Sequence, residues 1–149
     1  MRWRSRSEIE RRLRLAGFEA SEVERAVLDL ERAGLIEDMR FAREVVRDQT
    51  TRRLSGERAI RLALREKGVS PEVVDAALEG AGDEGPRALA LATKAATRMG
   101  ALGPEAAYRR LYGLLMRRGY GPGVAREAVQ QALHTLSEVL QDDESGLRL

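Results

Sequence analysis

The chain of 149 residues contains no cysteine and a single histidine, His134. Without cysteine it has no disulfides and no thiolate ligands, and one histidine cannot supply the imidazole set of a zinc site. We therefore expect no metal and no other cofactor. Aromatic residues make up only 4% of the chain. The core must consequently be built mainly from Leu, Val, Ile and Ala.

Long apolar segments and enzyme motifs are also missing. No run approaches the ~20 apolar residues of a membrane span, and the start, MRWRSRSEIE, lacks the apolar segment of a signal peptide. No Gly-rich phosphate loop precedes a lysine, and there is no nucleophile elbow or Ser/His/Asp set. We expect a soluble, cytoplasmic chain with no membrane association, no catalytic residues and no enzymatic activity.

The most informative pattern present is a repeat. Gly17, Gly68 and Gly119 recur at intervals of 51 residues, each after a basic segment that contains leucine. A pair of apolar residues lies eight and four positions before each glycine: Ile9 and Leu13, Ile60 and Leu64, Leu111 and Leu115. This spacing places each pair on one helical face, and glycine then ends the helix in the left-handed conformation. The pattern predicts one small helical unit that is repeated three times.

The remaining pattern fills in this architecture. Because no segment alternates apolar and polar residues, we predict an all-α fold of tandem three-helix repeats that form an elongated, curved array. The first repeat is expected to be truncated to two helices. The predicted parts are residues 1–36 (repeat one, two helices), 37–81 (repeat two, three helices), 85–140 (repeat three, three helices) and 141–149 (a flexible acidic tail). Residues 80–86, GAGDEGP, are the expected hinge.

A helix end and a helix start are predicted at the border between repeats one and two. Gly34 is expected to close the second helix of repeat one, and Asp38 to act as the N-cap of the next helix. In that helix Phe41 is expected to face the core together with Val45 and Val46.

Charge follows the repeat as well. Residues 40–69 contain nine basic and four acidic residues, whereas residues 70–86 contain no basic and five acidic residues. The same change from basic to acidic occurs at the other two glycines. In one interpretation, neighbouring helices of opposite charge attract each other, at ~0–1 kcal/mol per exposed pair. Alternatively, the basic helices form a banded surface that suits a periodic partner such as a filament or nucleic acid.

Rows of cations on the basic helices are the candidate partner-binding residues. Arginines at i, i+3 and i+7 share one helical face, although such a row is often only a solvated surface. The candidates are Arg40, Arg43 and Arg47 in the first row, Arg58, Arg61, Arg65 and Lys67 in the second, and Arg109, Arg110, Arg117 and Arg118 in the third.

Three stretches resemble the RecX family of bacterial recombination regulators: RSRSEIERRL near the start, GLIEDMRFA (residues 34–42) and IRLALREKGVSPEVVDAAL (residues 60–78). The resemblance is strong over residues 4–79 and looser from 85 to 140. It implies tandem three-helix repeats and a regulator without enzymatic activity. It also implies that the chain binds the RecA filament on DNA along its groove. Inhibition of the ATPase, strand-exchange and coprotease activities of RecA is then expected, with single- or double-stranded DNA as a possible further contact. We expect the chain to be a monomer.

Two other functions stay open at this point. The basic bands and the pI of about 9.4 also fit a helical module that binds DNA without a RecA partner. A scaffold for some other protein is the third hypothesis.

Overall fold

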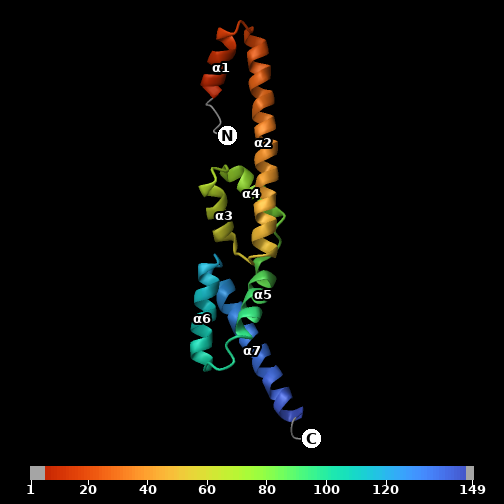
Figure 1. Cartoon of the computed structure of the whole chain (residues 1–149), viewed down its shortest axis with the longest axis vertical. Helices are drawn as coiled ribbons and strands as arrows, with labels where there is room; N and C mark the ends of the chain where they lie inside the picture. Colours follow the sequence, from red (N-terminus) through yellow and green to blue (C-terminus); the bar gives the residue numbers. More distant parts are fainter. Residues whose placement is uncertain (1–5, 147–149) are drawn as a thin grey trace. The chain divides into compact units, whose positions relative to one another are not determined.

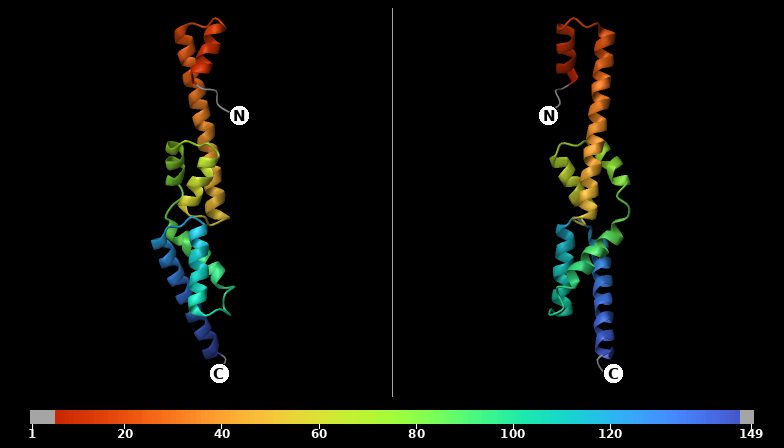
Figure 2. Two further views of the ribbon diagram at one scale, coloured as in Figure 1. Left: turned by 90° about the vertical axis from the view of Figure 1, so that its left-hand side faces the viewer. Right: turned by 45° about the vertical axis from the view of Figure 1, so that its right-hand side comes forward.

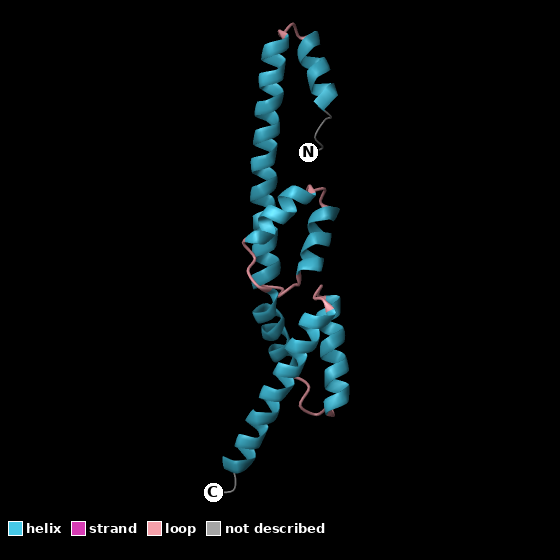
Figure 3. Ribbon diagram, turned by 180° about the vertical axis from the view of Figure 1, so that it is seen from behind, coloured by secondary structure: helices cyan, strands magenta, loops and turns pink. Residues whose placement is uncertain are grey.

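The computed structural model describes residues 6–146, which form seven α-helices and no strand (Figures 1 and 3). The helices are α1 (Arg6–Leu15), α2 (Ala20–Thr51), α3 (Glu57–Glu66), α4 (Pro71–Glu79), α5 (Glu84–Ala96), α6 (Pro104–Arg117) and α7 (Pro122–Gly146). The prediction of an all-α fold is confirmed. Helix α7 includes most of the segment predicted as an acidic tail, and residues 147–149 lie outside the described part.

The chain divides into two compact units, Met1–Phe41 and Ala42–Leu149. The first contains α1 and the N-terminal part of α2. The second contains the rest of α2 and the helices α3 to α7. The repeat boundaries at residues 36/37 and 81/85 remain a prediction.

Helix α2 corrects the expectation for the border between repeats one and two. Gly34 does not end a helix and Asp38 is not an N-cap, because α2 continues without a break from Ala20 to Thr51. The segment contains no proline, and one interior glycine costs only ~1 kcal/mol, which a long helix tolerates. Phe41 was also placed wrongly: it is 40% exposed, whereas the neighbouring Ala42 is fully buried.

The three repeated glycines behave as the spacing predicts. Gly17, Gly68 and Gly119 have φ angles of +94°, +79° and +94° and follow α1, α3 and α6. In each case the residue after the glycine donates its backbone N–H to the carbonyl of the leucine that lies four positions before the glycine. The bonds are Phe18 to Leu13 (3.2 Å), Val69 to Leu64 (3.1 Å) and Tyr120 to Leu115 (3.1 Å). This is the Schellman arrangement, in which a left-handed glycine lets the chain satisfy carbonyls at a helix end.

The second unit contains two groups of buried side chains. Figure 2 shows α3 and α4 beside the C-terminal part of α2. Ile60 and Leu64 of α3 are both fully buried. Helices α5, α6 and α7 pack around a second cluster that includes Leu111, Leu115 and Tyr120, all fully buried (Figure 1). The apolar pairs predicted for repeats two and three therefore form the core.

Candidate interaction surfaces

The first predicted row of cations is exposed to solvent. Arg40, Arg43 and Arg47 are all exposed on α2, and in the second unit Arg43 and Arg47 lie one helical turn apart. These arginines are therefore exposed although α2 does not begin at Asp38, where the sequence had predicted a helix start.

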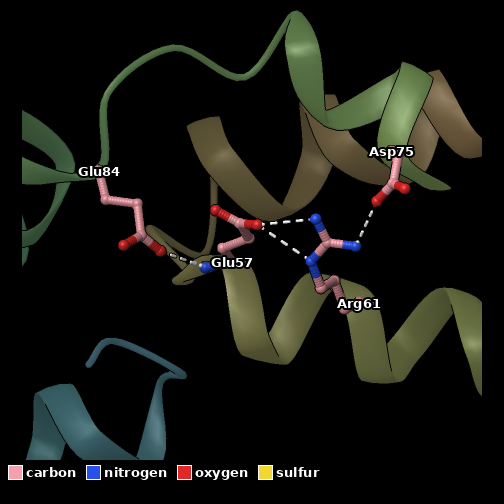
Figure 4. A network of polar contacts seen from close by, with 4 residues as sticks. All are labelled: Glu57, Arg61, Asp75 and Glu84. Carbon is pink, nitrogen blue, oxygen red and sulfur yellow. Dashed lines mark hydrogen bonds and ion pairs between the residues drawn. The ribbon is translucent and has the colours of Figure 1, made fainter.

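The second row consists of exposed cations and one cation, Arg61, that is partly exposed and paired within the protein. Arg58, Arg65 and Lys67 are exposed on α3 and at its C-terminal end. Arg61 instead lies between two carboxylates (Figure 4). Its Nε donates to Glu57 Oε1 at 2.9 Å, and its Nη1 donates to Asp75 Oδ1 at 2.7 Å. Arg61 thus joins α3 to α4 and is less available to a partner than its neighbours.

These contacts have an electrostatic consequence and continue to the next helix. The hydrogen bonds to Asp75 and then to Glu57 raise the pKa of Arg61 above its ordinary value. The backbone N–H of Glu57 donates to Glu84 Oε1 at 2.5 Å, which connects α3 to the start of α5 (Figure 4). Glu84 belongs to the segment predicted as a hinge, so this segment is held at one point by a hydrogen bond to α3.

The third row lies on α6. Arg109, Arg110 and Arg117 are exposed, whereas Arg118 is half-buried and its Nη1 donates to the backbone carbonyl of Arg53. Arg118 therefore connects the C-terminal end of α6 to the segment that follows α2.

Two glycines bring these segments together at what we call the junction, the contact between residues 53–59 and residues 118–120. Gly56 N–H donates to the Arg118 carbonyl at 2.7 Å, and Arg58 N–H donates to the Gly119 carbonyl at 3.2 Å. A Cβ atom on Gly119 would lie 2.6 Å from Ala59 Cβ, and one on Gly56 would lie 2.6 Å from the Tyr120 nitrogen. The backbones approach this closely only because both residues are glycine.

The junction also contains a buried cation that the sequence reasoning missed. Arg87 is 9% exposed, and its Nε donates to the Ser55 carbonyl at 2.7 Å while its Nη1 donates to the Ala81 carbonyl at 3.2 Å. The feature of the sequence that pointed to a buried Arg87 is its position directly before the apolar segment ALALA, residues 88–92. Nearby, the hydroxyl of Tyr120 donates to the Leu54 carbonyl at 2.5 Å, and burial raises the pKa of Tyr120.

The described residues offer little for metal chemistry. Within residues 6–146 no group of three or more His, Asp or Glu side chains is arranged to hold a metal ion. In the same part of the chain, every buried side-chain nitrogen or oxygen has a hydrogen-bond partner. No described helix is both long and apolar enough to cross a membrane. What the described residues do offer is exposed cations on α2, α3 and α6.

Comparisons with known proteins agree with this architecture. A family model described as "RecX, second three-helix domain" matches residues 38–78. The regulatory protein RecX of Corynebacterium efficiens is 36% identical, and the match covers 94% of this chain and 70% of that protein. The regulatory protein RecX of Mycolicibacterium vanbaalenii is 38% identical, with 89% of this chain and 76% of that protein covered.

Solved structures show the same fold. The crystal structure of RecX from Lactobacillus salivarius matches with a TM-score of 0.62 at 22% identity, over 88% of this chain and 86% of that one. A second crystal structure, of a regulatory protein RecX, matches with a TM-score of 0.59 at 25% identity, over 87% of this chain and 64% of that one. The resemblance found in the three sequence stretches is therefore confirmed over most of the chain.

Proposed function

The chain belongs to the RecX family of regulatory proteins, and on this premise we propose that it binds the filament that RecA recombinase forms on DNA. It lies along the groove of the filament and inhibits the ATPase, strand-exchange and coprotease activities of RecA. The protein acts by binding and carries out no chemical step of its own.

The observation that carries this proposal is the recurrence of exposed cations on three helices, α2, α3 and α6. Arg40, Arg43 and Arg47 on α2, Arg58 and Arg65 on α3, and Arg109 and Arg110 on α6 are all exposed. Each contact with an exposed anionic group contributes only ~0–1 kcal/mol. Several such contacts on one chain add up, because once one has formed the next is effectively intramolecular. A periodic partner is the target on which such repeated contacts can form together.

The test is a titration of the DNA-dependent ATPase of RecA. We expect substoichiometric wild-type chain to slow ATP hydrolysis, and the Arg40→Glu/Arg43→Glu/Arg47→Glu variant to inhibit several-fold less. The matched control is Arg25→Glu/Arg32→Glu/Arg126→Glu, which reverses three exposed charges outside the predicted rows. It should inhibit like the wild type. The absence of inhibition by the wild-type chain at any ratio would contradict the proposal.

The same cations support a second candidate, a module that binds DNA without RecA. Binding to naked DNA should then be tight and should weaken steeply with salt, since neutralised phosphates release counterions. The acidic stretches count against this candidate, because residues 70–86 contain five acidic residues and no basic residue. Strong, steeply salt-dependent binding to naked DNA together with an unchanged RecA ATPase would favour the second candidate over the first.

A further inference from the structure

A groove in the second unit gathers five cations, of which only Arg118 belongs to the three predicted rows. It has a volume of about 270 Å³ and lies between the end of α2, the C-terminal half of α5 and the end of α6. We call it the basic groove. Five of its lining residues are cations, and none is acidic: Arg52, Arg53, Lys94, Arg98 and Arg118.

Most of this positive charge is not neutralised within the described part of the chain. Arg53, Lys94 and Arg98 are exposed, and none of them forms an ion pair with another residue in the range 6–146. Arg52 pairs with Asp48 at 3.2 Å, but its side chain is 82% exposed. Arg118 is held in place by its bond to the Arg53 carbonyl. The junction therefore fixes the position of Arg118, and the other four cations line the same groove.

Between these cations the groove is apolar. Leu91, Leu54 and Leu114 line it, and Leu91 is only 7% exposed. A second groove of about 350 Å³ shares Arg53 and Arg118 with the first and adds Arg117 and the exposed Leu62. The two grooves place aliphatic surface next to the same pair of arginines.

Helix dipoles account for only part of this arrangement. Cations are common in the last turn of a helix, where they face the partial negative charge of the free carbonyls. Lys94 and Arg98 lie at the end of α5, and Arg52 and Arg53 lie at the end of α2. The dipole explains why each pair stands at its own helix end. It does not explain why both pairs line one apolar groove that has no acidic residue.

We propose that the basic groove binds an acidic peptide segment of a partner protein, in which Asp or Glu residues alternate with apolar residues. The carboxylates pair with Lys94, Arg98 and Arg53, and an apolar side chain of the segment covers the partly buried Leu54 and Leu114. Charge-assisted hydrogen bonds to arginine give the orientation, and removal of apolar surface from water adds affinity.

The lining favours a peptide over nucleic acid. Grooves that take single strands combine a basic track with aromatic side chains on which the bases stack. Neither groove has an aromatic residue in its lining. If the phosphates faced the cations with the bases turned away, the leucines would remain uncovered. A segment with both carboxylates and apolar side chains matches both parts of the groove.

This inference goes beyond the proposed function, because it specifies the chemistry of the bound segment and holds whichever protein supplies it. Its test consequently needs no RecA. Fluorescence anisotropy of a labelled peptide with the repeated sequence Asp-Leu-Glu is measured as the full-length chain is added. The comparison probes are a peptide with Lys in place of each acidic residue and a labelled thymidine oligonucleotide.

The groove variant is Lys94→Glu/Arg98→Glu, and its control is Arg25→Glu/Arg126→Glu, which changes the net charge equally at exposed positions outside both grooves and outside the predicted rows. We expect the acidic peptide to bind the wild type and the control alike, and the groove variant about tenfold more weakly or worse. Equal binding to the control and the groove variant would overturn the proposal, as would equal binding of the Lys peptide. Tighter binding of the oligonucleotide, lost in the groove variant, would assign the groove to nucleic acid instead.

Discussion

The junction gives the sharpest stability prediction, because it separates two glycines that look alike in sequence. Gly68 and Gly119 both follow a helix with positive φ, at +79° and +94°. Alanine in such a conformation costs about 1–2 kcal/mol at either position. Around Gly68, however, an added Cβ would meet no atom within 4 Å. The Gly68→Ala change should therefore lower the free energy of unfolding only by the cost of placing alanine in this conformation.

At Gly119 the added methyl group has no room. Its carbon would lie 2.6 Å from Ala59 Cβ and closer still to the Ala59 nitrogen, so the two backbones must move apart. That movement breaks the bonds from Gly56 to Arg118 and from Arg58 to Gly119. Each contributes about 1 kcal/mol. We expect Gly119→Ala to lower the free energy of unfolding by about 3–4 kcal/mol, against about 1–2 kcal/mol for Gly68→Ala.

Urea unfolding measures this difference. Far-UV circular dichroism follows the helices, and near-UV dichroism of the three tyrosines, all between residues 108 and 120, reports on α6 and its C-terminal end. Gly17→Ala is a second control, since Gly17 also has a φ of +94° and no atom within 4 Å of an added Cβ. Equal losses of stability for the three variants would refute the account of the junction.

Three further predictions concern the buried and paired groups of the second unit. Arg87→Met leaves two backbone carbonyls without a donor and should lower the free energy of unfolding by about 1–3 kcal/mol, measured by urea titration. Arg61→Met removes only partly exposed ion pairs, so the same titration should show a loss of no more than about 1 kcal/mol. Burial raises the pKa of Tyr120, so the unfolded chain loses this phenol proton first as the pH rises. The contribution of Tyr120 is therefore complete below about pH 10 and is lost as the pH rises toward the folded pKa. Urea titrations at rising pH should show this decline in the wild type and a smaller one in Tyr120→Phe.

The sequence predicted the features that depend on local pattern. A left-handed glycine after a helix and a leucine four positions before it are set by neighbours in the chain, and all three glycines have the predicted conformation. Periodicity alone placed the arginines of α2 at exposed positions. Here Arg40, Arg43 and Arg47 are exposed even though the predicted start of their helix was wrong.

Features that depend on distant residues could not be predicted in this way. Gly34 with Asp38 four positions later reads locally like a helix end and a new N-cap, yet α2 runs through both residues and contains no proline. Nothing near Arg61 in sequence indicates that Asp75 on α4 would be its partner. The basic groove combines side chains from three separate segments, and only the fold brings them together.

Direct binding to the filament tests the central claim. RecA is assembled on single-stranded DNA with a non-hydrolysable ATP analogue, the chain is added, and the filaments are sedimented. The account predicts that the wild-type chain sediments with the filament and that Arg40→Glu/Arg43→Glu/Arg47→Glu does so several-fold less. If the wild-type chain stays in the supernatant at every ratio while the filaments sediment intact, the chain does not bind RecA filaments and the account is contradicted.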